Sequence, residues 1–334
     1  MGIRVLIIDD SPTMRALLAL RLSGHADIRV VGMADSAVQG RAMIKELEPD
    51  VVTLDIEMPG MNGLDFLDKI MTLRPMPVII VSGLTQDGSD ATARALALGA
   101  VDCYCKADRG GAQDNGGLAE MVRNAAKVRV RRRVGAHQQQ PLQSAARSED
   151  TRLIAIGSST GGVEALQVLL GSFPADCPPA MIVQHVDSRF APAIARTLDA
   201  VCPAQVVLAE ADMPLQRGHV YLAPGDDRHM MVAGTRTMFV KLRPGNPVSG
   251  HRPSVDALFH SVAQMLGPDA VGILLTGMGA DGAKGLLAMA RAGAQTIAQD
   301  EATCTVFGMP RVAISLGAAN VVAPLGRIAQ LALA

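Results

Sequence analysis

Residues 153–162 read LIAIGSSTGG, an apolar run that leads directly into a turn of small residues. An apolar run followed by glycines and serines is typical of a buried strand that turns sharply into a helix. The glycines allow the backbone to turn tightly and to approach a ligand closely. The stretch therefore predicts a strand at Leu153–Ile156 and a helix at Gly162–Leu170, the opening unit of an α/β sheet.

The remainder of residues 151–334 repeats this alternation. A helix is expected at Ala283–Ala292, and further strands are expected at Ala180–Val183, Gln205–Leu208, His219–Leu222, Ala270–Leu275 and Ala294–Ala298. Strands that alternate with helices indicate a parallel, doubly wound sheet. The predicted fold of this part is therefore a Rossmann-like α/β domain.

Residues 1–125 carry the same kind of pattern in a second sheet. Strands are predicted at residues 3–8, 50–54, 77–81 and 100–105, and helices after Ser11-Pro12, at Ala91–Leu98 and at residues 119–133. A flavodoxin-like α/β domain accounts for this order. Residues 126–150 are predicted to be a helix end and a linker, because residues 134–150 are polar and lack periodicity.

Composition narrows the class of protein. A chain of 334 residues predicts roughly two domains. The net charge of −1 gives no bulk field toward nucleic acid or membrane, and no apolar run approaches the ~18 residues that span a bilayer. Five cysteines without a CxxC pair favour reduced thiols. No signal peptide is evident, so we expect a cytoplasmic protein that does not insert into membranes, with a monomer as the default state.

Five polar residues follow the predicted strands of the first domain: Asp9, Asp10, Asp55, Ser82 and Lys106. In open α/β sheets this edge binds ligands. Converging carboxylates repel one another unless a cation lies among them, and a set of oxygen ligands suits Mg²⁺. Any one Asp is more often a helix cap, but the full set favours a phosphorylation site at Asp55. Lys106 and Ser82 would then contact the phosphoryl oxygens.

A second set of residues points to acyl-transfer chemistry. Ser159 lies at the centre of a Gly-x-Ser-x-Gly spacing, with Ser158 as the other candidate nucleophile. His185 and Asp281 follow two further strands and would supply the base and its partner. Each residue also has a structural explanation, since such a turn can cradle phosphate, a lone His is often structural and Asp281 can cap a helix. The chain order Ser, His, Asp differs from that of α/β hydrolases.

Residues 3–125 resemble a response-regulator receiver domain. The segment LDIEMPGMNG at residues 54–63 is similar to the phosphorylation-site signature of that family. The resemblance implies phosphotransfer from a histidine kinase to Asp55. It also implies Mg²⁺ bound by Asp10, Asp55 and the backbone carbonyl of Glu57, with Asp9 nearby. The chain departs from the family pattern at Ala107, where proline is usual, and at Cys103, where an aromatic residue is usual.

Residues 152–334 resemble the catalytic domain of the CheB-type chemotaxis receptor methylesterases. The motifs that carry the resemblance are IGSSTGG at 156–162, QH at 184–185, HRPSVD at 251–256, LTGMGADGA at 275–283, QDEAT at 299–303 and GMP at 308–310. The resemblance implies that Ser159 is the nucleophile, His185 the general base and acid, and Asp281 its partner. It also implies that the backbone N–H of Met278 binds the oxyanion.

The implied reaction is hydrolysis of glutamyl methyl esters on methyl-accepting chemotaxis receptors, with release of methanol. Deamidation of glutamine side chains is implied as a second activity of the same acyl-enzyme. In the family the unphosphorylated receiver covers the active site, and phosphorylation relieves this block. One departure lies beside the base, where Val186-Asp187 replaces the usual Met-Pro.

Two other functions stay open at this stage. A receiver-controlled transcriptional regulator would use the basic segment Arg123–Arg133, although no DNA-reading element is recognisable. A hydrolase of the same fold acting on a different protein or a small ester is the second alternative. The sequence does not separate this from a receptor esterase.

Overall fold

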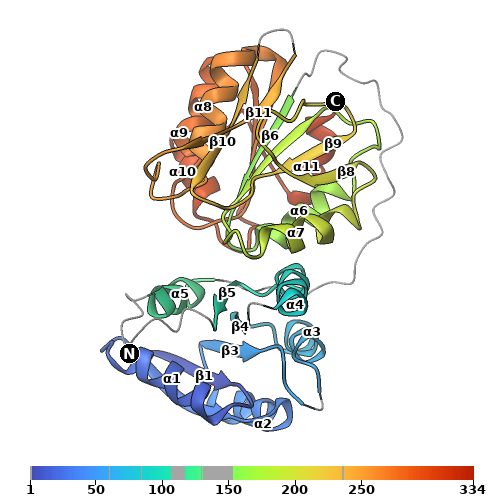
Figure 1. Ribbon diagram of the computed structural model, residues 1–334. Coiled ribbons are helices and arrows are strands. Elements are labelled where there is room, and N and C mark those ends of the chain that lie inside the picture. Colours follow the sequence, from blue (N-terminus) through green and yellow to red (C-terminus); the bar gives the residue numbers. More distant parts are fainter. Residues whose placement is uncertain are drawn as a thin grey trace. The chain divides into compact units, whose positions relative to one another are not determined.

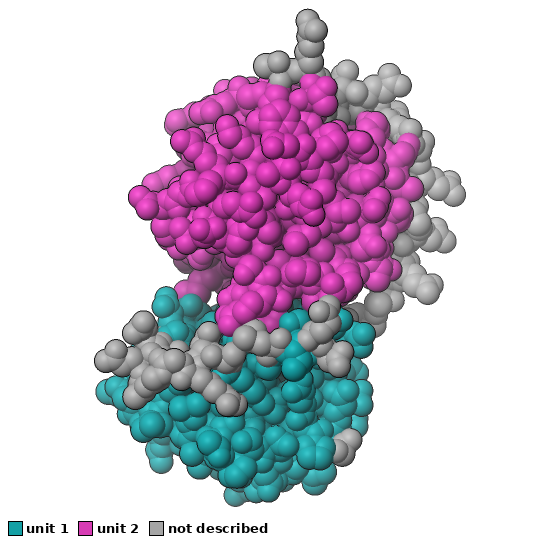
Figure 2. All heavy atoms as spheres, in the orientation of Figure 1, with its two compact units in different colours: residues 1–136 teal, residues 137–334 magenta. Residues whose placement is uncertain are grey.

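The computed structural model describes residues 2–59, 61–83, 85–106, 117–128, 130, 153–234 and 237–334, without the side chains of residues 86 and 87. The chain divides into two compact units, residues 1–136 and residues 137–334 (Figure 2). The division falls within the segment that is predicted to be a helix end and linker. Each unit is built around a sheet of its own.

The first unit contains a five-stranded parallel sheet in the order β2-β1-β3-β4-β5 (Figure 1). Its strands are β1 (Ile3–Ile8), β2 (Ile28–Ala34), β3 (Val51–Asp55), β4 (Val78–Ser82) and β5 (Asp102–Cys105). Strands β3 and β4 are buried along their whole length, as expected for a parallel sheet that is covered on both faces. Their carboxyl ends carry the polar residues of this unit to one edge.

The described helices that connect these strands are α1 (Pro12–Ser23), α2 (Ala37–Leu47), α3 (Gly63–Leu73) and α4 (Gln86–Ala97), and α5 (Gly117–Ala125) follows β5. Helix α1 begins as the sequence predicts, because the Ser11 side chain accepts a hydrogen bond from the Met14 N–H and proline occupies the first turn. The predicted helix at residues 119–133 is wrong at its end. Helix α5 stops at Ala125, and residues 129 and 131–133 lie outside the described residues.

The second unit contains a seven-stranded parallel sheet in the order β14-β13-β12-β6-β7-β9-β8. Its strands are β6 (Leu153–Ser158), β7 (Ala180–Gln184), β8 (Gln205–Leu208), β9 (His219–Leu222), β12 (Ala270–Leu274), β13 (Gln295–Gln299) and β14 (Val321–Ala323). Strand β6 lies at the centre of the sheet, with β7, β9 and β8 on one side of it and β12, β13 and β14 on the other, so the strand order reverses at β6. The crevice at such a reversal of strand order is where open α/β sheets bind ligands.

Helices cover both faces of this sheet (Figure 1). Helices α8 (Val255–Leu266), α9 (Ala283–Arg291) and α10 (Met309–Ser315) pack together on one face, and α6 (Gly162–Leu170), α7 (Ala191–Asp199) and α11 (Leu325–Ala332) cover the other. A short 3-10 helix, η1 (Gly267–Asp269), follows α8. The core between α8, α9 and the sheet includes Phe259, Leu286 and Met289, all fully buried.

One element of the second unit has no counterpart in the sequence prediction. Strands β10 (Arg228–Ala233) and β11 (Phe239–Pro244) form an antiparallel pair that is separate from the main sheet and packs against α8. The segment that returns from β11 to α8 lies beside the functional edge. Among the described residues, no helix is both long enough and apolar enough to cross a membrane.

Candidate active site

Ser159 lies in the turn between β6 and α6. Gly161 has a φ of 74°, and a Cβ there would lie 2.5 Å from the Thr305 side chain, so this turn requires glycine. The Ser159 N–H donates to the Thr276 carbonyl at 3.0 Å, which ties the turn to the loop after β12. At Gly277 a Cβ would lie 2.7 Å from that of Ser159. A side chain at position 277 would therefore displace the serine.

Gln184 holds the backbone around this serine. Its amide nitrogen donates to the carbonyls of Ser159 at 2.9 Å and His185 at 3.1 Å, and its amide oxygen accepts from the Ser158 hydroxyl at 2.7 Å. The Ser158 hydroxyl is thus buried and engaged, whereas Ser159 is half-buried at the surface of the turn. The geometry favours Ser159 over Ser158 as a nucleophile.

His185 lies directly beside Ser159 along the backbone. Strands β6 and β7 pair in parallel, with Ser158 opposite Gln184. Ser159 and His185 are the residues that follow this pair, one after each strand, so their backbones lie about 5 Å apart. The imidazole Nε2 is 2.8 Å from Asp281 Oδ2. Its Nδ1 is buried and has no hydrogen-bond partner among the described residues. The base therefore has one nitrogen held and one nitrogen free to exchange a proton.

Asp281 receives more hydrogen bonds than any single helix cap requires. The Oδ2 atom accepts from His185 and from the Val255 N–H at 2.8 Å, and Oδ1 accepts from the Ser254 hydroxyl at 2.7 Å. The N–H groups of Asp256 and Gly282 also donate to Oδ1, each at 3.0 Å. Two of these donors belong to the first turn of α8, where the helix dipole also favours negative charge.

These contacts decide the charge of the Asp281 carboxyl. Burial acts to raise its pKa, but the bonds and charge from His185 and the bonds from Asp256 and Ser254 outweigh burial, and the net pKa is lowered. The carboxylate stays ionised although its side chain is fully buried. It can therefore hold the His185 tautomer that carries hydrogen on Nε2 and can stabilise the imidazolium.

A second imidazole lies against the base. The rings of His251 and His185 are parallel within 8° and their centroids are 3.8 Å apart. Asp187, two residues after the base, adds no isolated negative charge. Its carboxylate pairs with the Arg189 guanidinium at 2.6 Å, and these bonds lower the pKa of Asp187.

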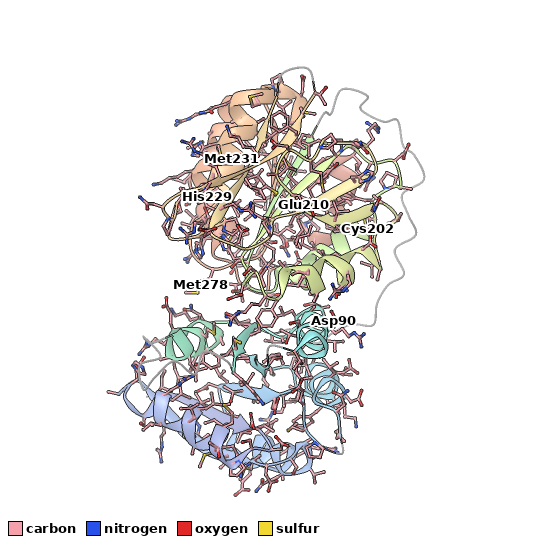
Figure 3. The ribbon with its side chains drawn as sticks, in the orientation of Figure 1. Asp90, Cys202, Glu210, His229, Met231 and Met278 are labelled. Carbon is pink, nitrogen blue, oxygen red and sulfur yellow. The ribbon has the colours of Figure 1, made fainter. Side chains whose placement is uncertain are left out.

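The loop after β12 supplies a candidate oxyanion donor. Among the described residues the N–H of Met278 has no protein acceptor, whereas Gly277 donates to the Val306 carbonyl at 3.1 Å. Met278 is half-buried and lies at the lower rim of this unit in Figure 3. A free N–H next to the serine turn is suited to an oxygen that gains negative charge during reaction. The predicted role of Met278 stays a prediction.

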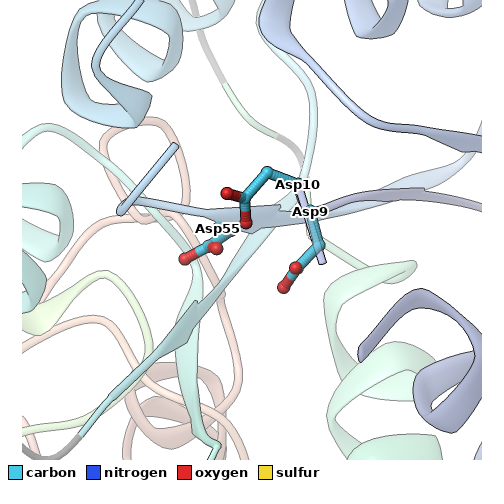
Figure 4. A group of neighbouring side chains, drawn as sticks. All are labelled: Asp9, Asp10 and Asp55. Atoms are coloured by element: carbon cyan, nitrogen blue, oxygen red, sulfur yellow. The ribbon is translucent and has the colours of Figure 1, made fainter. Parts of the chain in front are cut away.

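The first unit gathers the predicted carboxylates at its own sheet edge. Asp9, Asp10 and Asp55 each offer an oxygen, and these oxygens lie within 4.8 Å of one another (Figure 4). Lys106 Nζ is 2.6 Å from Asp55 Oδ2 and 3.2 Å from Asp9 Oδ2. Three carboxylates facing one ammonium leave surplus negative charge, and an all-oxygen set fits a hard divalent cation.

The charges of this cluster shift the pKa values of Asp9 and Lys106. Burial and the Asp55 charge raise the pKa of Asp9, and Lys106 offsets this only in part. Burial acts to lower the pKa of Lys106, but the bonds and charges of Asp55 and Asp9 raise it overall. The ammonium therefore stays charged beside the candidate phosphorylation site.

The other residues that the sequence singled out in this unit are Ser82, Glu57, Cys103 and Ala107. The Ser82 hydroxyl donates to the Gly88 carbonyl in the first turn of α4 at 3.1 Å, so this bond engages it with that helix. The Glu57 N–H donates to Asp55 Oδ1 at 3.1 Å, and the role of the Glu57 carbonyl as a metal ligand stays a prediction. Cys103 is half-buried, and Ala107 lies outside the described residues.

Sequence reasoning assigned no role to four residues that build the second site. Gln184, Ser254 and His251 lie in the motifs that carried the resemblance, yet their contacts arise only from tertiary structure. Ser254 had a local signal, since a serine before an apolar helix is a typical N-cap. Thr276 had none, although its hydroxyl donates to the Thr160 carbonyl at 3.0 Å and accepts from the Val306 N–H at 2.9 Å.

The basic segment Arg123–Arg133 gives no support to a nucleic-acid surface within its described part. Arg123 forms two hydrogen bonds to the Asp27 carboxylate, at 2.7 and 2.9 Å. The arginines at 129 and 131–133 lie outside the described residues.

Comparison with known proteins agrees with both sequence resemblances. A family model described as CheB methylesterase matches residues 154–332, and one described as response regulator receiver domain matches residues 5–109. A solved structure described as the CheB methylesterase catalytic domain of Thermotoga maritima is 34% identical with a TM-score of 0.53. It covers 54% of this chain and 96% of that chain.

Curated relatives match over nearly the whole length. A protein of Agrobacterium fabrum is 50% identical over 98% of this chain and 95% of its own. A protein of Caulobacter vibrioides is 52% identical over 95% of this chain and 93% of its own. Both are named protein-glutamate methylesterase/protein-glutamine glutaminase.

Proposed function

Because this chain belongs to the CheB methylesterase family, we propose that it is a phosphorylation-controlled serine hydrolase acting on methyl-accepting chemotaxis receptors. It hydrolyses glutamyl methyl esters and deamidates glutamine side chains. The observation that carries the proposal is the state of His185. One ring nitrogen is bound to an ionised Asp281, and the other is buried and has no hydrogen-bond partner among the described residues. The backbone of His185 is hydrogen-bonded to that of Ser158, directly before Ser159.

The reaction begins when the Ser159 hydroxyl attacks the ester carbonyl and gives its proton to His185 Nδ1. The charge of the resulting imidazolium is balanced by Asp281 through the hydrogen bond at Nε2. The carbonyl oxygen becomes an oxyanion and accepts a hydrogen bond from the Met278 N–H. When the tetrahedral intermediate collapses, His185 returns the proton to the departing methoxide and methanol leaves.

The acyl-enzyme is then hydrolysed by the same groups in reverse roles. His185 Nδ1 takes a proton from water, the hydroxide attacks the acyl carbonyl, and Ser159 leaves with the proton restored. The product is the glutamate side chain. A glutamine side chain enters the same sequence with ammonia as the leaving group, which gives the glutaminase activity.

The first unit is proposed to set the activity of the second. Asp55 accepts a phosphoryl group from a chemotaxis histidine kinase. Asp9, Asp10, Asp55 and the Glu57 carbonyl are the groups that would hold Mg²⁺. That ion would neutralise the carboxylates and the incoming phosphoryl oxygens. The Lys106 ammonium, already 2.6 Å from Asp55, holds the transferred phosphoryl group, and the Ser82 hydroxyl turns toward it.

Release of methanol from methylated receptor membranes tests the proposed reaction. Wild type, Ser159→Ala and Ser158→Ala are compared, with ammonia release from glutamine-bearing receptors measured in parallel. We expect Ser159→Ala to lose release by about 10⁶-fold, which is near background, and Ser158→Ala to retain turnover. Loss in Ser158→Ala with full activity in Ser159→Ala would overturn the assignment of the nucleophile. Absence of release from the phosphorylated wild type would overturn the receptor as substrate and favour another ester.

A further inference from the structure

His251 is the one imidazole in ring contact with the proposed base among the described residues. Asp281 holds the His185 ring by a hydrogen bond at Nε2, and Nδ1 has no hydrogen-bond partner among the described residues, so no second hydrogen bond fixes the plane of the ring. The parallel ring of His251, 3.8 Å away, covers one face of the His185 ring. We propose that His251 is a positioning residue that holds the plane of His185 during the proposed hydrolysis.

The backbone that carries His251 is itself firmly held. Val248 and His251 exchange two backbone hydrogen bonds of 3.0 Å, and Ser249 and Gly250 between them have φ values of 53° and 84°. Positive φ at both central residues is typical of a type I′ turn. The ring therefore projects from a tight, closed turn and not from a long flexible loop.

A side-chain hydrogen bond connects this turn to helix α8. The Ser249 hydroxyl donates to Asp256 Oδ2 at 2.6 Å, and Asp256 Oδ1 accepts from the Gly285 N–H of α9 at 2.7 Å. Helix α8 is the helix whose first turn binds Asp281. The same helix end thus fixes the partner at the edge of His185 and the turn that covers its face.

Buried His229 reinforces the arrangement from β10. Its Nδ1 accepts from the Ser254 N–H at 3.2 Å, so Nε2 carries hydrogen and donates to the Asn246 carbonyl at 2.9 Å. This ring joins the segment that precedes the turn to the N-terminus of α8. The adjacent Arg252 turns its guanidinium away, to the Gly245 carbonyl at 2.9 Å.

The His251 ring is suited to remain neutral. Burial lowers its pKa, and the charge of His185 lowers it further, while Asp281 acts in the opposite direction. A neutral aromatic face accommodates the imidazolium that forms on His185, whereas a second cation would repel it. Holding the ring plane matters because a shift of about 1 Å in a reacting group can lower a rate by about 10²-fold.

The test compares His251→Ala, His251→Phe and His260→Ala in the full-length protein. His260 is an exposed histidine of α8 and serves as the matched control. We expect His251→Ala to lower kcat for methanol release by about 10- to 100-fold with KM changed less than about threefold. His251→Phe retains a flat ring and is expected to restore most of kcat. His260→Ala is expected to match wild type.

Because this inference rests on the proposed function, a second readout is independent of the natural substrate. Phenylmethanesulfonyl fluoride sulfonylates an activated serine: the Ser159 oxygen bonds to sulfur, fluoride leaves and His185 takes the proton. The labelling rate, followed by intact mass, needs the serine and its base but no receptor. If wild type is labelled but releases no methanol, the proposed substrate fails while the role of His251 is still measured.

The two readouts give clear outcomes for His251. Slow labelling and low kcat in His251→Ala, with recovery of both in His251→Phe, support the positioning role. Wild-type rates in His251→Ala would contradict it. A folded His251→Phe that is as slow as His251→Ala would also contradict it, because the imidazole nitrogens and not the flat ring would then be required.

Discussion

The two sheet edges of this chain place carboxylates in opposite electrostatic situations. In the first unit Asp9, Asp10 and Asp55 face one another with Lys106 as their ammonium partner, so negative charge is in excess. In the second unit Asp281 accepts hydrogen bonds from five donors, and these compensate the cost of burying its charge, so its net pKa is lowered. There the group without a hydrogen-bond partner among the described residues is the Nδ1 of His185.

This difference separates two kinds of site that share one fold class, a parallel α/β sheet with polar residues at its carboxyl edge. An edge with surplus charge gains most from binding a cation and a phosphoryl group, so its state depends on what is bound. An edge with a compensated carboxylate and a free imidazole nitrogen is ready to move protons without further ligands. Fold class alone therefore does not assign function, whereas the charge balance at the strand ends does.

The largest expected effect comes from disturbing the compensated carboxylate. Asp281→Asn keeps the size of the side chain but replaces one acceptor oxygen with an amide that donates. The new amide NH₂ would then face groups that donate to Asp281, and His185 would lose the acceptor that favours the tautomer with hydrogen on Nε2. We expect kcat for methanol release to fall by about 10⁴-fold.

Asp269→Asn in η1 is the matched control for this substitution and is expected to retain wild-type kcat. Thermal unfolding of both variants separates lost chemistry from lost folding. Retention of more than a tenth of wild-type kcat by a folded Asp281→Asn protein would remove Asp281 from the proposed relay.

Sequence patterns predicted both parallel sheets and the residues at their carboxyl ends, because a buried parallel strand is a continuous apolar run with a visible end. Those patterns did not predict the partners of Asp281. Ser254 and the first turn of α8 reach that carboxylate across 25 to 27 residues of sequence. Such contacts depend on how a helix docks, which local periodicity does not encode.

The β10–β11 pair and the His251 turn were missed for a related reason. The short strand Arg228–Ala233 alternates weakly between buried and half-buried positions, so its period gives little signal. The predicted end of the last helix of the first unit, at residue 133, was also wrong, because a run of basic residues is compatible with helix propensity, whereas α5 ends at Ala125.

A smaller effect is expected from adding Mg²⁺ to the edge with surplus charge. The ion should bind the folded receiver unit and raise its unfolding free energy by about 1.5–3 kcal/mol at 10 to 100 times the Kd. Asp10→Asn should remove most of this gain. Asp35→Asn is the control, since Asp35 follows β2 at the same edge but is not in the cluster. Differential scanning calorimetry with and without Mg²⁺ measures the shift, and an equal shift in Asp10→Asn would argue against this ligand set.

The smallest expected effect is a difference between the pKa shifts of Asp281 and Asp9, which have opposite signs when no metal is bound. The pKa of Asp281 is lowered, so its contribution to stability is complete above the unfolded value of 3.8 and is lost as pH falls through its folded value. The pKa of Asp9 is raised, so its unfavourable contribution is present at neutral pH and is relieved as pH falls through its folded value toward 3.8. Carboxyl-carbon NMR titration of the full-length protein checks both directions, and shifts of the same sign would contradict the contrast.

Control of one edge by the other is tested most directly by methanol release with and without acetyl phosphate and Mg²⁺, in wild type and in Asp55→Asn. Coupling between two sites typically changes an equilibrium affinity by about 5- to 150-fold, and we use the same range for the change in rate. The account predicts that acetyl phosphate accelerates release by wild type within this range and leaves release by Asp55→Asn unchanged. Equal release by wild type with and without the phosphodonor, or equal acceleration of both proteins, would contradict it.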